Sequence, residues 1–321
     1  MLRSISVPPI FKFILRRMMG MLPVLALVLV VTFLAAHALP GDPVQVMLSD
    51  HSANLQMALR LRAQYGLDQP LWRQFIAYAA GVLHGDFGLS FLRVGVPVTE
   101  VLREAVTISP LLALAALAVA LPLGTLAGVL AAMRRNTWVD HTIIVVLVAG
   151  LSIPNFTIAT FLVYGFALKL EILPVAGWGS LEQAVLPVVV LAIPSAAYIA
   201  RLARTFMLEA LQQDYIRTAR AKGLRERLVI GRHALRNIVV PLMTSAGVIF
   251  GGLVSNAFVV ETIFNIPGLG RIAIDSIFAR DYPVTMAIVV LFTVFFLFIN
   301  LAVDLGCVMV DPRLRARTLT S

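Results

Sequence analysis

Six long stretches of the chain contain no Asp, Glu, Lys or Arg, and shorter polar segments separate them. They cover residues 18–41, 105–133, 141–168, 183–200, 237–260 and 282–303. A helix needs roughly 20 apolar residues to cross a hydrocarbon core about 30 Å thick. Because backbone groups in lipid must be paired within their own segment, the pattern predicts six transmembrane helices and an all-α polytopic fold. An even number of spans places both termini on one side of the membrane.

The segments around these stretches contain further local signals. A helix-like stretch near 71–83 predicts a helix within the long connection after the first span. Pro154 follows Ser152 and Ile153 inside the third stretch, and a proline there predicts a break or kink.

The connection at 201–236 contains a short amphipathic helix. Asp214 is a candidate N-cap, and Gly223 suits the left-handed residue that follows a helix. At about 100° per residue, one face carries Tyr215, Ile216, Ala219 and Gly223. Arg217 and Arg220 form a basic rim beside that face. Such a helix fits either lipid headgroups or a groove on a partner protein, and the residues favour neither.

Composition and charge distribution support membrane insertion. The chain of 321 residues is 60% hydrophobic and 13% charged, with a formal net charge of +9. The basic residues lie between apolar runs, which argues against a nucleic-acid-binding surface. The N-terminus, the second and fourth connections and the C-terminal tail hold 18 of the 26 Lys and Arg residues. The positive-inside bias therefore places both termini in the cytoplasm.

The sequence offers no catalytic machinery. The three lysines, Lys12, Lys169 and Lys222, do not follow a glycine, so no phosphate-binding loop is present. The six stretches hold no carboxylate, and the histidine spacing fits no metal motif. The single cysteine, Cys307, excludes an internal disulfide. We expect a non-enzymatic chain that binds no cofactor and no metal. Its lack of charged residues in the middle of the spans also argues against a secondary transporter.

Five motifs, in order along nearly the whole chain, carry a resemblance to a known family. They are LPGDP at 39–43, YGLDQPL at 65–71, GDFG at 85–88, the segment DYIRTARAKGL at 214–224 with HALRN at 233–237, and ETIF at 261–264 followed by IPGLG and RDYP. Together they resemble permeases of ABC importers for peptides (dipeptides and oligopeptides) or nickel. The segment at 214–224 is similar to the EAA loop, although Arg217 and Thr218 stand where the general pattern has Glu and Ala.

The resemblance implies a type I ABC importer permease in the bacterial cytoplasmic (inner) membrane. It implies a cytoplasmic N-terminus followed by the first transmembrane helix at 1–41, and a periplasmic or extracellular loop at 42–104. An ABC transmembrane type-1 domain would cover 97–306, with its coupling loop at 201–236, and a cytoplasmic tail would follow at 307–321. The implied partners are a second homologous permease, two cytoplasmic ATPase subunits that use ATP, and a periplasmic or lipid-anchored substrate-binding protein.

The resemblance also gives a role to the amphipathic helix. It would be the coupling helix that sits in a cleft of one ATPase, where Gly223 and Ala219 allow close approach and Arg217 and Arg220 pair with acidic residues. We predict that Gly223→Asp abolishes transport without preventing insertion. The residues assigned to this helix are Asp214, Tyr215, Arg217, Thr218, Ala219, Arg220 and Gly223.

Two further groups of residues are candidates for function. Pro154, Asn155, Ser195 and Asn256 lie within spans and are candidates for the pore or gate, with hydrogen bonding between helices as the alternative. Asp68, Asp86, Glu261 and Asp281 are candidates for docking the binding protein. Peptide is the favoured substrate, with nickel or another small solute left open. A self-sufficient secondary transporter or channel is the alternative function.

Overall fold

The computed structural model describes residues 9–38, 43–48 and 55–310. In these ranges the chain is helical, and the only extended pairing is a bridge between Leu89 and Pro97. The first predicted motif, at 39–43, lies almost entirely outside the described residues.

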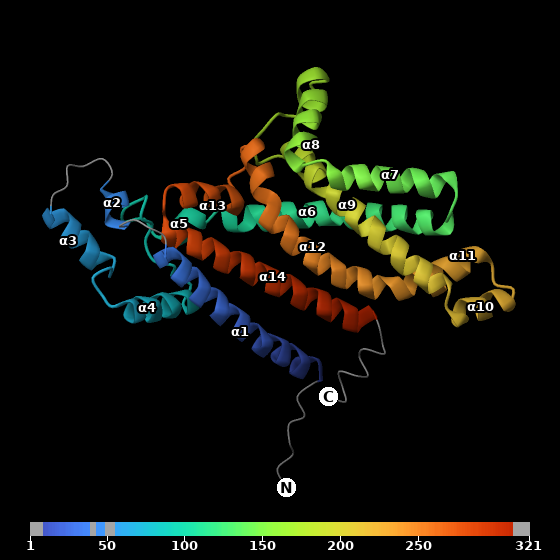
Figure 1. Cartoon of the computed structure of the whole chain (residues 1–321), viewed down its shortest axis with the longest axis horizontal. Coiled ribbons are helices and arrows are strands. Elements are labelled where there is room, and N and C mark those ends of the chain that lie inside the picture. Colours follow the sequence, from blue (N-terminus) through green and yellow to red (C-terminus); the bar gives the residue numbers. More distant parts are fainter. Residues whose placement is uncertain (1–8, 39–42, 49–54, 311–321) are drawn as a thin grey trace, which may run out of the picture. The chain divides into compact units, whose positions relative to one another are not determined.

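The helices follow one another along the chain as Figure 1 shows. Their bounds are α1 Pro9–Ala38, α2 Pro43–Met47, α3 Leu55–Gln64, α4 Leu71–Leu83, α5 Val98–Leu102, α6 Ala105–Met133, α7 Trp138–Ser152, α8 Asn155–Leu162, η1 Val163–Lys169, α9 Leu181–Leu211, α10 Asp214–Ala221, α11 Glu226–Leu228, η2 Val229–Ala234, α12 Leu235–Ile263, α13 Leu269–Phe278 and α14 Tyr282–Val310. The two η segments are π-helical.

Five helical segments in the described ranges are long and apolar enough to cross a membrane. They are Phe13–Ala38, Val98–Met133, Leu181–Leu211, Glu226–Ile263 and Tyr282–Val310. A sixth span arises if the pair Trp138–Ser152 and Asn155–Lys169 counts as one. The all-α polytopic fold predicted from the charge-free stretches is therefore confirmed.

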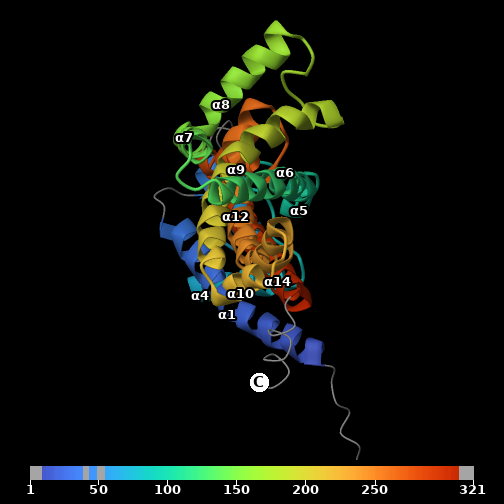
Figure 2. The ribbon, with the colours of Figure 1, turned by 90° about the vertical axis from the view of Figure 1, so that its right-hand side faces the viewer.

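The third predicted span is broken, as Pro154 predicted. The two halves meet at an angle of 101°, and α8 turns away from the direction of α7 in Figures 1 and 2. The peptide between Ile153 and Pro154 is extended at both residues, and Pro154 caps α8 instead of continuing α7. The third stretch therefore holds two helices with a break at Pro154, as predicted.

The fourth span is longer than its charge-free stretch. We expected a span at 183–200 and a loop from 201 onward, but α9 runs to Leu211 through Arg201, Arg204 and Glu209. The charge-free stretch shows which part of the helix can lie in lipid. The helix itself can continue into water, because its end depends on backbone hydrogen bonds. Ser180 and Gln183 form a capping box at the start of α9.

The chain forms two compact units, each with its own core. The first comprises Met1–Arg17, Leu111–Ile266 and Phe296–Ser321, and the second comprises Met18–Pro110 and Pro267–Phe295. The core of the first unit joins α6, α9, α10, η2 and α12 through small and aliphatic side chains such as Ala203, Met207 and Leu242. The core of the second joins α5, α13 and the adjoining parts of α6 and α14, with Leu102, Leu269 and Ile288 buried.

Candidate functional site

The amphipathic helix predicted at 214–223 is α10, and its apolar face is anchored in the protein itself. Ile216 and Ala219 are buried in the core of the first unit, together with Met207 and Ala210 of α9 and Val229 of η2. Contrary to our expectation, Ala219 is therefore not available for close approach by a partner. Nor does α10 offer an apolar face to lipid headgroups.

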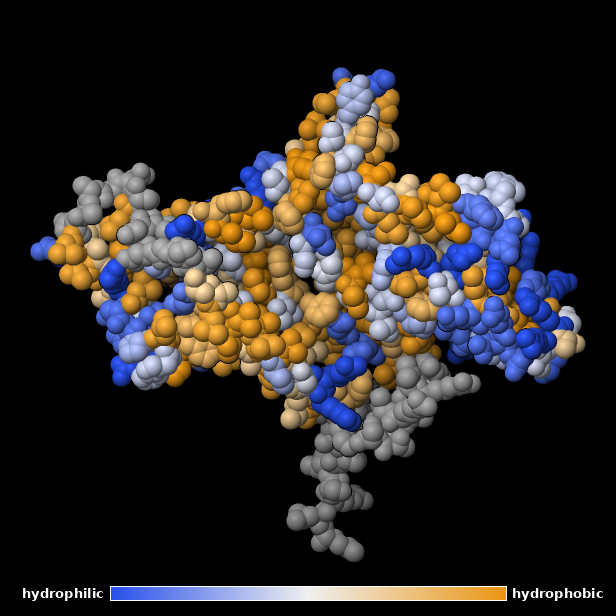
Figure 3. All heavy atoms as spheres, in the orientation of Figure 1, coloured by the Kyte–Doolittle hydropathy of each residue, from blue (hydrophilic) through white to orange (hydrophobic). Residues whose placement is uncertain are grey.

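The exposed surface of α10 is polar and basic. Asp214, Tyr215, Arg217, Thr218 and Arg220 are all exposed. Arg217 lies 3.5 Å from Asp214, and the two side chains are 75% and 95% exposed. Hydrophilic side chains cover the end of the first unit that carries α10 and α11 in Figure 3. This surface suits a water-exposed protein partner.

Arg220 is engaged within the chain. Its guanidinium donates hydrogen bonds to both carboxylate oxygens of Glu226, at 3.2 and 2.6 Å. These bonds raise the pKa of Arg220 above its ordinary value. The ion pair ties α10 to α11 and leaves Arg217 as the more accessible cation of the helix.

The two ends of α10 differ in how well the sequence predicted them. The N-cap is Gln213, whereas Asp214 is the first helical residue, so the N-cap assignment was wrong. Its carboxylate still lies in the first turn, where it complements the helix dipole. At the other end, Gly223 has φ +74° as predicted. Its N–H donates to the carbonyl of Arg220 at 2.9 Å, and the N–H of Leu224 donates to that of Ala219 at 3.3 Å, which is a Schellman motif.

An ion pair that the sequence did not reveal joins α7 to α9, the helix that leads into α10. Arg204 Nε and Nη2 donate to the two carboxylate oxygens of Asp140, each at 2.8 Å. The N–H of Asn136 donates to Asp140 as well, at 3.0 Å. The Asp140 side chain is 2% exposed and that of Arg204 24%. Because 64 residues separate the partners, no periodicity in the sequence points to the pair.

The candidate pore and gate residues are spread over three helices. Pro154 and Asn155 lie at the break between α7 and α8. Ser195 donates to the carbonyl of Leu191 in its own helix α9, and Asn256 donates to Gly252 in its own helix α12. Among the residues that the structure describes, Ser195 and Asn256 therefore do not form the hydrogen bonds between helices that we considered as their alternative role.

The four candidate docking residues divide by burial. Asp68 and Asp86 are exposed. Glu261 and Asp281 are buried, so neither carboxylate faces a partner. Asp281 instead accepts hydrogen bonds from Ser90 Oγ and from the N–H groups of Phe91 and Leu92, which fixes the loop before α5. The Asp281 carboxylate, which lies in a predicted outer loop, therefore holds another part of the same chain in place.

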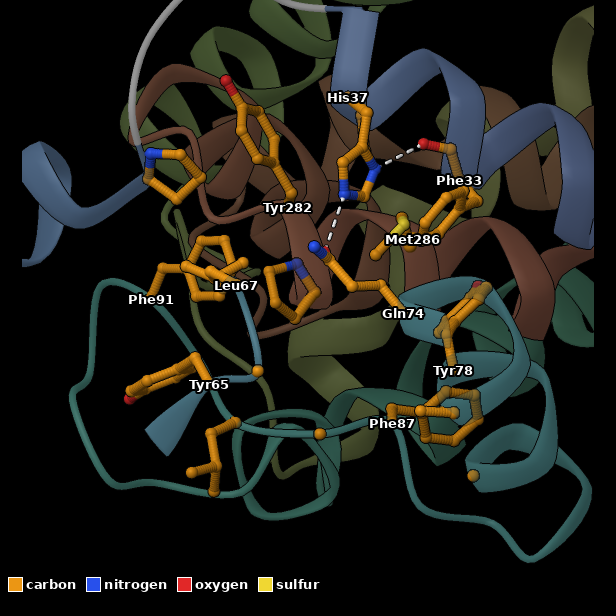
Figure 4. Close-up of a pocket in the computed structure, with 18 of the residues that line it drawn as sticks. Phe33, His37, Tyr65, Leu67, Gln74, Tyr78, Phe87, Phe91, Tyr282 and Met286 are labelled. Carbon is orange, nitrogen blue, oxygen red and sulfur yellow. Dashed lines mark hydrogen bonds between the residues drawn. The ribbon is translucent and has the colours of Figure 1, made fainter. Parts of the chain in front are cut away.

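The second unit contains a cavity of about 490 Å³ between the outer part of α1, α4 and the start of α14. Aromatic rings form much of its wall, as Figure 4 shows. Its polar groups include His37, whose ring nitrogens lie 2.9 Å from the carbonyl oxygen of Phe33 and 3.3 Å from Gln74 Oε1. A second hollow in the same unit, lined by Arg93, Glu100, Arg103 and Asp275, is of mixed charge.

Known proteins are similar to this chain in sequence and in fold. Residues 124–316 match the family of binding-protein-dependent transport system inner membrane components, and residues 10–97 match the N-terminal membrane component of such systems. The glutathione transport system permease proteins GsiC of Shigella flexneri serotype 5b (strain 8401) and Escherichia coli (strain K12) are each 38% identical over 304 residues, covering 95% of this chain and 99% of theirs.

Solved structures of ABC transporters share the fold. The MetNI methionine ABC transporter in an inward-facing conformation has a TM-score of 0.58 at 20% identity, covering 66% of this chain and 97% of that one. An amino acid ABC transporter with histidines has a TM-score of 0.51 at 17% identity, covering 65% and 93%. The family match over residues 124–316 and the 38% identity to the GsiC proteins show that the chain belongs to the family of binding-protein-dependent transport system inner membrane components: it is a multi-pass permease subunit of an ABC importer, without a catalytic site of its own.

Proposed function

We propose that this permease forms half of a translocation path for short peptides of the glutathione class and couples to its ATPase subunits through α10. The substrate class rests on identity to the two GsiC proteins across almost the whole chain. The importer also needs a second permease, ATPase subunits and a substrate-binding protein, as its family does.

The observation that carries the coupling role is the division of α10 into a buried and an exposed face. Ile216 and Ala219 fix the helix to α9 and η2, while Tyr215, Arg217 and Thr218 remain accessible. A helix that is rigidly joined to a spanning helix passes on a displacement rather than absorbing it. Closure of the ATPase subunits would thus move α9 together with α10, and the Asp140–Arg204 pair would carry α7 along.

The remaining assigned residues fit around this movement. Pro154 and Asn155 mark a break at which the two parts of the third span can change their angle, while Ser195 and Asn256 lie on the helices that contact α8. On the outer side, the exposed Asp68 and the charged hollow lined by Glu100 and Arg103 are the surfaces we assign to the binding protein.

The test is a complete importer reconstituted in liposomes with its binding protein. Arg217→Glu should reduce both peptide uptake and the stimulation of ATP hydrolysis by the loaded binding protein. Arg135→Glu makes the same charge change at an exposed site in the connection before α7 and should leave both unchanged. Equal behaviour of the two variants would refute the coupling role of α10.

The substrate class is tested in the same liposomes with labelled glutathione, a dipeptide and nickel. Uptake of glutathione that an unlabelled short peptide inhibits would support the proposal. Stimulated ATP hydrolysis with uptake of nickel but no peptide would overturn the substrate class and leave the coupling role intact.

A further inference from the structure

Helix α4 runs back along the outer end of α1. The ring centroids of Phe33 and Phe75 are 5.3 Å apart, and those of Phe33 and Tyr78 are 6.2 Å apart. Four residues further along α1, His37 lies 3.3 Å from Gln74. His37 follows Phe33 in α1, whereas its partner Gln74 precedes the two partners of Phe33 in α4. The two helices are therefore antiparallel at this contact (Figure 4).

The position of Phe33 in the first span sets the depth of α4. The span Phe13–Ala38 has charged residues up to Arg17 and none from there to its end. About 20 residues cross the hydrocarbon, which places its outer boundary near His37 and Phe33 about 6 Å inside it at 1.5 Å per residue. Tyr78 is level with Phe33, and α4 continues five residues beyond it to Leu83. Its second half therefore lies at the depth of the outer leaflet.

The composition of α4 and the turn after it suits that depth. Residues 74–85 contain no Asp, Glu, Lys or Arg. Trp72, Ile76 and Leu83 lie within 40° of one another around the helix, and they are 60%, 58% and 82% exposed. The nearby α1 side chains Val31 and Leu34 are 54% and 59% exposed, so the apolar surface continues from the span onto α4. The space-filling view shows hydrophobic surface over α4 (Figure 3).

The start of α4 has the residues expected at a membrane–water interface. The Arg73 guanidinium carbon lies 5.1 Å from the centroid of the Trp72 ring. Trp and Arg at the end of an inserted segment favour the headgroup region.

The turn that follows α4 pairs its own backbone. The N–H groups of His84 and Asp86 donate to the carbonyl of Gly81, each at 2.9 Å, and Gly85 donates to Val82 at 3.1 Å. A Cβ on Gly81 would lie 2.7 Å from the carbonyl oxygen of Asp86, so glycine permits this close return. Asp86 lines the 490 Å³ cavity. Irregular backbone is tolerated at membrane depth where it lines such a cavity and has its polar groups paired.

We infer that α4 and its following turn form a re-entrant element that dips into the outer leaflet beside α1, with Trp72 at the headgroups and Ile76 and Leu83 against lipid acyl chains. This inference is independent of the substrate and of the coupling role. It commits the exposed face of α4 to lipid, rather than to the binding protein or the second permease.

Tryptophan fluorescence in the assembled importer tests this depth. Replacing Trp138 and Trp178 by Phe leaves Trp72 as the only tryptophan of the chain. A second probe adds Trp72→Phe and Leu83→Trp to that background. All tryptophans of the partner subunits are replaced by Phe as well. The complexes are placed in nanodiscs with phospholipids brominated either near the headgroup or deep in the acyl chain.

Both probes should lose fluorescence to brominated lipid, and Leu83→Trp should lose more to the deep bromines than Trp72 does. Leu34→Trp, in the first span, is the positive control. Leu55→Trp in the more polar helix α3, where Leu55 is 74% exposed, should respond to aqueous acrylamide instead. Retained ATP hydrolysis shows that each complex is assembled. Acrylamide quenching of Leu83→Trp without loss to any brominated lipid, or protection from both quenchers by a partner subunit, would overturn the inference.

Discussion

Removing one partner of the Asp140–Arg204 pair should destabilise the first unit strongly. Asp140→Asn keeps the size of the side chain but sets an amide against a guanidinium that donates two hydrogen bonds at 2.8 Å. Breaking a buried ion pair costs about 3–5 kcal/mol, whereas an exposed pair contributes about 0–1 kcal/mol. Because the Asp140 side chain is enclosed and that of Arg204 is 24% exposed, we expect a loss of about 2–3 kcal/mol, between these limits.

A double-mutant cycle isolates this interaction. Asp140→Asn, Arg204→Gln and the double variant are compared by denaturant unfolding of the purified chain in detergent. The double variant should lose less stability than the sum of the single ones, because an amide pair leaves no uncompensated charge. Asp304→Asn, which breaks the 2.9 Å pair with the 53% exposed Arg17, is the control and should have little effect. Additivity of the two single losses to within about 0.5 kcal/mol would refute the argument.

Three further perturbations follow from local geometry. Gly223→Ala should destabilise α10 by about 1–2 kcal/mol, because the left-handed φ of +74° disfavours a Cβ; its control Gly231→Ala, with equally open space and no positive φ, should not. Gly223→Asp should additionally abolish transport, while membrane fractionation still finds the chain inserted. Loss of insertion would contradict this prediction. Gly128→Ala would put its Cβ 2.2 Å from the carbonyl oxygen of Ala200, so thermal unfolding should show a loss of about 1–3 kcal/mol from overpacking α6 against α9, with Gly165→Ala as the unaffected comparison. Asp281→Asn should speed hydrogen exchange at the N–H groups of Phe91 and Leu92, which donate to its carboxylate; exchange as slow as in Asp275→Asn, an exposed site, would show that the carboxylate does not hold the loop.

Segments whose structure depends on nearby residues were predictable. The apolar stretches located the spans, because a helix that crosses the hydrocarbon core needs about 20 uncharged residues. Pro154 predicted the break between α7 and α8, since it cannot continue the helix before it. Gly223 predicted the end of α10, because few other residues adopt its left-handed backbone.

The environment of individual charged residues was not predictable in the same way. Asp86 and Asp281 both lie in segments that are similar to the outer loops of the family, yet Asp86 is exposed and Asp281 is buried under three hydrogen bonds. The partner of Asp281 is more than 180 residues away in the sequence. No local pattern distinguishes the two carboxylates.

The sequence by itself therefore determined the membrane class, the positions of the spans and the place of the candidate coupling helix, because hydropathy, proline and glycine act within a few residues. The tertiary structure decided which face of α10 remains accessible, that Arg204 pairs with Asp140, and that α4 lies antiparallel to α1. Burial and pairing depend on contacts between segments far apart in the chain, and such contacts exist only once the helices have packed.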